Sequence, residues 1–323
     1  MKTMRVHETG GALGMEEIPR PEPGPGQVRL RVHAAGVNFA DTLMVAGRYQ
    51  ERPELPFAPG IEVCGTVETL GEGVETPAHG ARVAAMCGSG GFAEAVLARA
   101  EACVPVPEAM SDADAAVLQV AYGTAHLALE RRAQLRPGER LLVLGAAGGV
   151  GLTAIEVGHL LGAEVIAVAR GADRLERARA AGATHLIDSE TGDIRTEVKA
   201  LGGADVVFDP VGGDQWVAAL RASNPEARLL PIGFASGEIP QIPANILLVK
   251  NLTVIGLYWG GYSTFAPRVL GESLETLIRW HGEGRIRPHV SHRVPLAEAN
   301  AALDLLRSRQ ATGKVVVEIG GQA

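Results

Sequence analysis

The residues of this chain with the clearest chemical potential form a glycine-rich turn at residues 141–151, with the sequence Leu-Leu-Val-Leu-Gly-Ala-Ala-Gly-Gly-Val-Gly. Small residues at a turn between a strand and a helix let the backbone approach a pyrophosphate, whose charge meets free N–H groups and the positive end of the helix. Aligned with G-x-G-x-x-G, the spacing places Ala146, Gly148 and Gly151 at the three motif positions. The turn predicts a dinucleotide site, with a ligand-free strand-to-helix turn as the alternative. The predicted binding residues are Ala146, Ala147, Gly148, Gly149, Val150 and Gly151.

The choice between NADPH and NADH is expected at the end of the next strand, about twenty residues after the turn. Ala169 stands there in place of the acidic residue that would accept the ribose hydroxyls of NAD. Arg170 and Arg174 follow, and both can form charge-assisted hydrogen bonds to a 2′-phosphate. The alternative is that both arginines are solvated surface charges, because Asp173 would repel a phosphate. We expect NADPH to be the preferred cofactor.

Two kinds of segment must position these residues. Between residues 4 and 110, short extended runs alternate apolar and polar residues at period two, as at 28–32, which is typical of an all-β barrel or sandwich. From Ser111, whose hydroxyl can cap a helix, helical and extended segments alternate, which indicates parallel strands with helical crossovers. The chain is therefore expected to be an α/β protein with a Rossmann-type doubly wound parallel sheet. The predicted strands of this sheet are 140–144, 164–168, 185–187, 205–209 and 228–232, and its helices include 149–161, 174–181 and 216–220.

Composition excludes several classes of function. The net charge of −7 leaves no basic surface that would attract a nucleic acid. Charges or glycines interrupt every apolar stretch before it could cross a bilayer, and no basic segment with an apolar core follows Met1. The three cysteines are far apart and odd in number, which fits a reducing compartment. We expect a cytoplasmic protein that acts on a small molecule.

Several short motifs are similar to those of one known family. They appear in the family's order along nearly the whole chain, at 36–41, 47–49, 59–65, 121–125, the glycine-rich turn and 311–315. The chain resembles the zinc-independent quinone oxidoreductases of the medium-chain dehydrogenase/reductase superfamily, which include zeta-crystallin. The resemblance implies a GroES-like β-barrel catalytic domain at 1–118 and 260–323, a Rossmann domain at 119–259, and a cofactor in the cleft between them.

The zinc-containing members of the superfamily provide a contrast. By this resemblance, the zinc-containing members have the motifs Gly-Val-Cys and Gly-His-Glu, and this chain has Asn38 in place of the cysteine and Ile61 in place of the histidine. Catalytic zinc needs at least three protein ligands, and structural zinc needs four clustered Cys or His residues, which three scattered cysteines do not supply. His289 and His292 lie in an extended segment rich in proline and valine, and are more typical of a surface. We expect no metal.

The resemblance also implies roles for individual residues. Asn38 is expected to contact the nicotinamide ribose or the substrate oxygen, with capping of the following helix as its alternative. Tyr49 is expected to donate its hydroxyl to the substrate or to cover an aromatic acceptor, with packing at the barrel edge as the alternative. Tyr122 and Thr124 resemble residues beside the nicotinamide, although Tyr122 could instead pack between domains. Lys314 is expected to reach the cofactor from the C-terminal strand.

Two further segments complete the expected cofactor site. The resemblance implies that the backbone of Gly233, Phe234 and Ala235 contacts the nicotinamide end of the cofactor. The resemblance implies an Asn-Tyr pair after the third Rossmann strand of related enzymes, with the tyrosine near the adenosine phosphate. This chain has Asp188 and Ser189 at those two positions. Ser189 can donate one hydrogen bond, but the stacking surface is gone, so the NADPH preference is expected to be smaller than the arginines suggest.

Three functions follow from these features. The first is NADPH-dependent reduction of a quinone by hydride transfer without a metal, in which the enzyme positions the nicotinamide and offers hydrogen-bond donors. The second is reduction of an enoyl or alkenal double bond conjugated with a carbonyl, and no residue separates these two. The third is a non-catalytic nucleotide-binding protein. The apolar segment 252–259 is expected to be an exposed edge strand, which predicts a homodimer joined through it.

Overall fold

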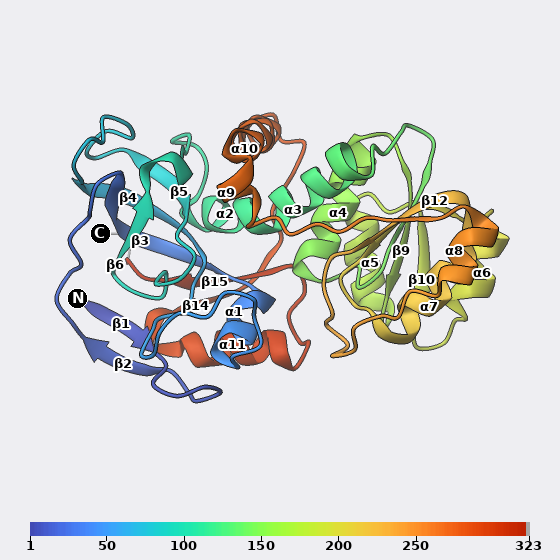
Figure 1. Cartoon of the computed structure of the whole chain (residues 1–323), viewed down its shortest axis with the longest axis horizontal. Helices are drawn as coiled ribbons and strands as arrows, with labels where there is room; N and C mark the ends of the chain where they lie inside the picture. Colours follow the sequence, from blue (N-terminus) through green and yellow to red (C-terminus); the bar gives the residue numbers. More distant parts are fainter. Residues whose placement is uncertain (321–323) are drawn as a thin grey trace. The chain divides into compact units, whose positions relative to one another are not determined.

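The computed structural model describes residues 1–320 and consists of two compact units (Figure 1). The first unit contains Met1–Val120 and the chain from Ser263 onward, so that both ends of the polypeptide contribute to it. The second unit is the continuous segment Ala121–Tyr262.

The first unit is built on a seven-stranded sheet with the order β14-β15-β3-β4-β5-β7, in which β6 also pairs with β3. Every pair is antiparallel except β14 with β15. The period-two pattern decides which face is buried, because Val28, Leu30 and Val32 are at most 1% exposed and enter the core. The prediction for residues 4–110 is confirmed for the strands, but the region is not all-β, because it also contains the helix α1 (Phe39–Val45) and the helical turn η1 (Ala100–Ala102). The strands are β3 (Gln27–Val37), β4 (Glu62–Leu70), β5 (Arg82–Met86), β6 (Ala95–Arg99), β7 (Cys103–Pro105), β14 (Val290–Pro295) and β15 (Lys314–Glu318).

Helices and a hairpin complete the first unit. Ser111 caps α2 as predicted, because its hydroxyl oxygen accepts the N–H of Asp114 at 3.1 Å. The helix α10 begins at Pro267, and proline suits the first turn of a helix because an N–H group there has no partner within the helix. The elements are the hairpin β1 (Lys2–Arg5) with β2 (Gly14–Glu17), the helices α1 (Phe39–Val45), α2 (Asp112–Val117), α10 (Pro267–Gly282) and α11 (Ala299–Arg307), and the short helical turns η1 (Ala100–Ala102) and η4 (Leu296–Glu298).

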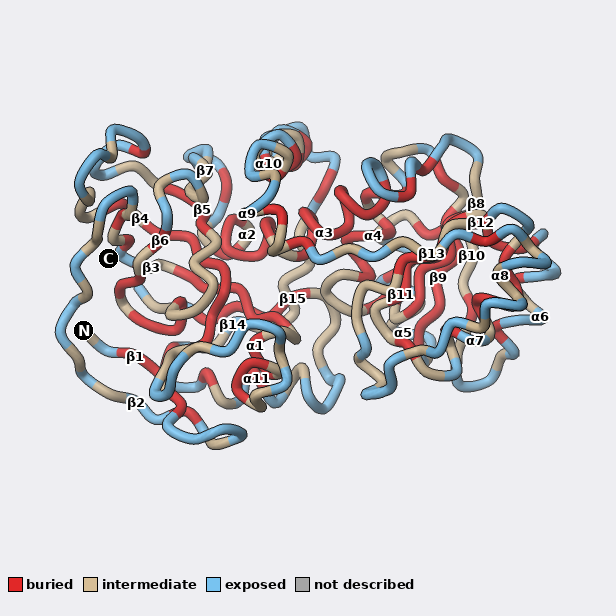
Figure 2. The backbone as a smooth tube through the Cα atoms, in the orientation of Figure 1, coloured by how far each residue is buried: buried red, intermediate tan, exposed pale blue. Residues whose placement is uncertain are grey.

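The second unit is a six-stranded, wholly parallel sheet with the order β10-β9-β8-β11-β12-β13. Numbered along the chain, these strands lie in the order 3-2-1-4-5-6, so the predicted doubly wound sheet is confirmed. β8, β9 and β11 are buried along almost their whole length, as Figure 2 shows, because helices cover the sheet. The strands are β8 (Arg140–Val143), β9 (Glu164–Ala169), β10 (His185–Asp188), β11 (Ala204–Asp209), β12 (Ser223–Pro231) and β13 (Thr253–Val254).

The helices of the second unit include two that the sequence pattern did not indicate, α6 and α8. α6 is short and polar apart from Ile194 and Val198, so its apolar signal is weak. No described helix is both long and apolar enough to cross a membrane. The helices are α3 (Gly123–His126), α4 (Gly149–Leu160), α5 (Ala172–Ala180), α6 (Ile194–Ala200), α7 (Gly213–Ala222) and α8 (Ala244–Lys250), with the π-helical turn η3 (Leu127–Arg132). The π-helical turn η2 (Leu118–Tyr122) and the short α9 (Tyr262–Phe265) span the points in the sequence where one unit ends and the other begins.

The strand predicted at 252–259 is wrong in its length, because the observed strand β13 contains only two residues. Only Thr253 and Val254 pair with β12, at the edge of the sheet, and Ile255 adds one hydrogen bond to Leu229. Pro231 follows shortly after Leu229 in β12 and has no N–H to extend a ladder, while Gly256 weakens the strand from the other side. The rest of the apolar segment is extended chain that ends in a turn.

Candidate functional site

Asn38 lies at the end of β3, at the N-cap position of α1, and is 7% exposed. Its side-chain amide points to two charged residues: Nδ2 donates to Glu62 Oε1 at 2.8 Å, and Oδ1 accepts from Lys314 Nζ at 2.6 Å. Lys314 on β15 is thus brought to Asn38 across 276 residues of sequence. Because one neighbour only donates and the other only accepts, the orientation of the amide is fixed.

Glu62 and Lys314 form a buried ion pair behind this amide, with Lys314 Nζ 3.0 Å from Glu62 Oε1. The second carboxylate oxygen of Glu62 accepts the backbone N–H of Val120 at 2.9 Å. Gly36 makes room for the pair, since a Cβ there would lie 2.6 Å from Glu62 Oε1 and 2.5 Å from a backbone oxygen of α2. The sequence motifs contained Glu62, but only the structure shows that it holds Asn38.

Asp41 orders the start of α1. Its carboxylate accepts the N–H of Asn38 through Oδ2 and the N–H of Gly60 through Oδ1, both at 2.8 Å. Burial raises the pKa of the Asp41 carboxyl to about 7, although these two N–H groups and the charge of Lys314 oppose the shift. Asp41 therefore connects the backbone at Asn38 with the loop that precedes Glu62.

Tyr49 lies in the bend that follows α1 and is half-buried. Gly47, just before it, has a φ of 66° and ends the helical segment in the left-handed region that favours glycine. The role of Tyr49 as a donor to the substrate, or as a cover for an aromatic acceptor, stays a prediction.

The residues around Asn38 do not fit a zinc ion. Asn38 and Ile61 offer an amide and an aliphatic chain, and Glu62 is already bonded to an ammonium group. Zinc in proteins is bound mainly by thiolates, imidazoles and carboxylates, and a catalytic ion needs three such ligands. No step of a reaction is assigned to a metal here.

Within residues 1–320, one group of three metal-binding side chains lies together: His33, Cys64 and Asp112. The side chains of this group bond to their neighbours without an ion. Asp112 Oδ1 accepts hydrogen bonds from Arg82 Nε at 2.7 Å and from the Cys64 thiol at 3.4 Å. His33 Nδ1 lies 3.3 Å from the other oxygen. Burial raises the pKa of the Cys64 thiol to about 12, so the thiol is neutral. The group fastens the start of α2 to the sheet.

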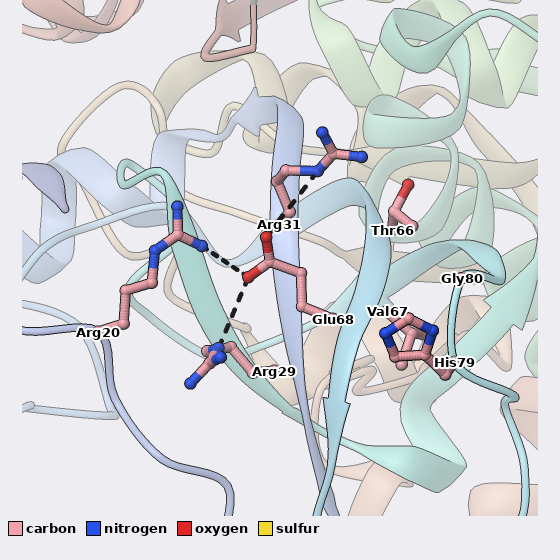
Figure 3. A pocket seen from close by; sticks show the side chains of 8 residues that line it. All are labelled: Arg20, Arg29, Arg31, Thr66, Val67, Glu68, His79 and Gly80. Carbon is pink, nitrogen blue, oxygen red and sulfur yellow. Dashed lines mark hydrogen bonds and ion pairs between the residues drawn. The ribbon is translucent and has the colours of Figure 1, made fainter.

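An open groove of about 600 Å³ lies on the first unit. Figure 3 shows that three arginines in it point to one carboxylate. Arg20 lies 2.6 Å, Arg29 3.6 Å and Arg31 4.0 Å from the nearest oxygen of Glu68. None of the predicted site residues lines this groove, and Glu68 already neutralises part of its positive charge.

In the second unit, the glycine-rich turn runs from β8 into α4, whose N-cap is Gly148. Ala146 N–H donates to Val168 of β9 at 2.9 Å, which holds the turn against the sheet. Gly145 has a φ of 56° and meets the need for a left-handed residue, although the motif alignment placed Ala146 first. Gly151 must also lack a Cβ, since one would lie 2.3 Å from Gly145 O. The N–H groups of the first turn of α4 have no partners within the helix, as phosphate binding requires.

The predicted selectivity segment follows β9, where Arg170 is exposed and Arg174 lies in the first turn of α5. Asp188, at the end of the adjacent β10, accepts the N–H of Gly171 at 3.1 Å through Oδ1. Ser189 N–H donates to Ala169 O at 2.9 Å. The structure thus brings Ser189 beside the segment that the sequence assigned to cofactor choice, and adds Asp188 to it.

Tyr122 is 1% exposed, and its hydroxyl donates to a carboxylate oxygen of Glu156 in α4. Thr124, two residues further on, is 8% exposed. Thr153 Oγ1 donates to Ala121 O at 3.1 Å, so this segment is fastened to the helix that follows the glycine-rich turn. The contacts give Tyr122 a packing role within the second unit, and a role beside the nicotinamide stays a prediction for both residues.

Gly233, Phe234 and Ala235 follow β12 as a loop that is anchored to the neighbouring strand. Ala235 N–H donates to Pro210 O at 3.1 Å, and Phe234 is 40% exposed. Asp209 at the end of β11 supports the loop next to it, because its buried carboxylate accepts the N–H groups of Val211 and Gly212. This buried acid is the last residue of the predicted strand 205–209, and that position is the one signal that could have identified it.

Residues 24–108 match the family of alcohol dehydrogenase GroES-like domains, and residues 149–274 match the zinc-binding dehydrogenase family. The quinone oxidoreductase-like protein 2 homolog of Nematostella vectensis is 41% identical over 323 residues, with 98% of this chain and 88% of that protein covered. The structure of the quinone oxidoreductase from Thermus thermophilus, also solved in complex with NADPH, has a TM-score of 0.88 and 38% identity, covering 98% of this chain and 100% of that one. The Escherichia coli quinone oxidoreductase complexed with NADPH has a TM-score of 0.93 at 28% identity, with coverage of 98% and 100%.

Proposed function

Because the chain belongs to the quinone oxidoreductase family of the medium-chain dehydrogenases/reductases, we propose that it uses NADPH to reduce a quinone by hydride transfer without a catalytic metal. The observation that carries the proposal is the orientation of the Asn38 amide by the buried Lys314–Glu62 ion pair. Asn38 stands at the position where the resemblance implies a cysteine in the zinc enzymes of the superfamily. The first unit is then the catalytic domain and the second unit the cofactor domain.

In the second unit, the proposed cofactor-binding residues act through backbone and charge. The turn 146–151 binds the pyrophosphate through N–H groups at the start of α4. Arg170 and Arg174 bind the 2′-phosphate, and the loop 233–235 supports the nicotinamide end. NADPH, when bound, supplies a hydride, which is one proton with two electrons, and the reduced quinone takes its remaining proton from water.

In the first unit, Asn38 is the proposed donor to the acceptor's carbonyl oxygen or to the nicotinamide ribose. One N–H of Nδ2 is used by Glu62, while the other has only a long contact of 3.5 Å to Gly36 O and is left for a ligand. Lys314 pulls electron density toward Oδ1 and so strengthens the N–H groups as donors. Negative charge that develops on a carbonyl oxygen is stabilised by such a fixed donor. Tyr49 is the second proposed contact to the substrate.

NADPH oxidation, followed by its absorbance, tests this function with a naphthoquinone, an enoyl-thioester and a short alkenal. Turnover with the quinone, unchanged after dialysis against a chelator, is the expected result. Faster turnover with the thioester or the alkenal would assign the chain to the enoyl and alkenal reductases instead. No turnover with any acceptor would favour a non-catalytic nucleotide-binding protein.

We also propose that the chain forms a homodimer through the sheet edge at β13, where Thr253 and Val254 leave one side of the ladder without a partner strand in the described chain. Light scattering at micromolar concentration should give the mass of two chains. A monomer at that concentration would contradict the proposal.

A further inference from the structure

We propose that Asp188 weakens the discrimination of this chain between NADPH and NADH, because its carboxylate repels the 2′-phosphate and offers an acceptor to the ribose hydroxyl of NADH. The inference rests on the proposed function, since it concerns the adenosine end of the same cofactor site. It identifies a specificity-determining residue that opposes the two arginines.

The position of Asp188 follows from the pairing of β10 with β9. Asp188 lies directly opposite Ala169 in the parallel register. Its Oδ1 accepts the N–H of Gly171 at 3.1 Å and the N–H of Glu190 at 3.0 Å. An acid that binds the ribose of NAD is expected at the end of the second strand, where this chain has Ala169. The structure therefore places a carboxylate beside that position, on the neighbouring strand.

The charge of Asp188 is held in place by the backbone. The N–H groups of Glu190 and Gly171 keep the pKa of the Asp188 carboxyl below its usual range, so the group is ionised at neutral pH. Gly171 is the N-cap of α5, where a phosphate would otherwise accept backbone N–H groups. Arg170 and Arg174 contribute two positive charges to this segment, while Asp188 and Asp173 contribute two negative charges. The four side chains together leave no net positive charge for a phosphate dianion.

The geometry of the carboxylate also suits a hydroxyl group. Both hydrogen bonds to Asp188 end on Oδ1, and among residues 1–320 none donates to Oδ2. A ribose 2′-hydroxyl is a donor, whereas a 2′-phosphate has only acceptor oxygens when fully ionised. Oδ2 therefore distinguishes the two cofactors in the direction opposite to Arg170 and Arg174.

Asp188→Asn is the direct test, because Asn keeps Oδ1 for both backbone donors, removes the charge and replaces the acceptor Oδ2 with an NH2 donor. Dissociation constants for NADPH and NADH are measured from nucleotide fluorescence at low ionic strength for the wild type and the variant. We expect the ratio of NADH to NADPH dissociation constants to rise roughly five- to tenfold, which corresponds to the repulsion in water between one unit charge and a dianion at a separation of about 7 Å. Asp173→Asn is the matched control, because it removes an exposed acid of the same segment that is not bonded to Gly171.

The outcomes separate the inference from the function on which it rests. A ratio that stays unchanged in Asp188→Asn, with both nucleotides still bound, overturns the inference alone. A shift of equal size in Asp173→Asn also overturns it, because the effect would then come from net charge. If the wild type binds neither nucleotide, the proposed function itself is wrong. Equal thermal midpoints for the wild type and Asp188→Asn establish that the variant is folded.

Discussion

Removal of the charge of Lys314, by substitution with methionine of similar length, tests how the Asn38 amide is held. The side chains of Lys314 and Glu62 are only 5% and 1% exposed, so the change would leave a buried carboxylate without a counter-charge. Breaking a buried pair in this way costs about 3–5 kcal/mol. Two N–H donors, from Asn38 and Val120, remain on Glu62 and favour the lower end of that range. We therefore expect Lys314→Met to reduce the free energy of unfolding by about 3 kcal/mol.

A double-mutant cycle shows whether this cost comes from the pair. Glu62→Gln alone should also destabilise the protein, because it leaves the ammonium of Lys314 buried without a carboxylate. In the double variant neither charge of the pair remains, so its loss of stability should be smaller than the sum of the two single losses by at least about 1 kcal/mol. Urea denaturation followed by circular dichroism provides the three values. Additive losses would refute the argument that the two charges compensate each other.

Three further predictions concern positions that the structure makes unusually clear. Gly151→Ala should weaken NADPH binding at least about tenfold in a fluorescence titration, because the new Cβ would lie 2.3 Å from Gly145 O. Gly271→Ala in α10 should stabilise the protein by about 1 kcal/mol in urea denaturation and leave the affinity unchanged, since nothing lies within 4 Å of its Cβ position and alanine is the better helix former. Asp41 has a raised folded pKa of about 7, so its contribution to stability is full below the unfolded value of 3.8 and is lost as the pH rises to about 7. Between these pH values the wild type should lose on the order of 4 kcal/mol relative to Asp41→Asn, as measured by urea denaturation at both ends of the range; parallel pH profiles would contradict this.

Local sequence signals were sufficient to predict the elements that are proposed to bind phosphate. The turn at 145–151 joins an apolar run to a helix, and both its spacing and its small residues are readable without a structure. The parallel sheet followed from the alternation of strands and helices, since such connections allow few arrangements. The edge segment 252–259 was misjudged because apolar residues indicate burial but not how long the neighbouring strand continues beside them.

The contacts that define the catalytic side of the site could not be inferred in the same way. Lys314 meets Glu62 across 252 residues, and no periodic pattern links β15 with β4. Asp188 was recognised as a departure from the family, but its bond to Gly171 depends on the register of two parallel strands. Both cases concern a charged side chain whose partner is set by sheet order, so that the residue type was visible and its role was not.

The arrangement at Asn38 determines how a positive charge can act in the proposed reaction. The Lys314 ammonium uses Asn38 Oδ1 and Glu62 Oε1 as acceptors, so the group proposed to face a ligand is the neutral amide. An amide does not ionise, which means that the donor strength of Asn38 depends on pH only through the charges behind it. The buried carboxyl of Asp41, whose pKa burial raises to about 7, bonds to the Asn38 backbone but not to the amide. The rate of the proposed hydride transfer should therefore change little between about pH 6 and about pH 8, even where the stability of the protein changes. A rate that followed the titration of Asp41 would contradict this and would show that the backbone at Asn38 does more than position the amide.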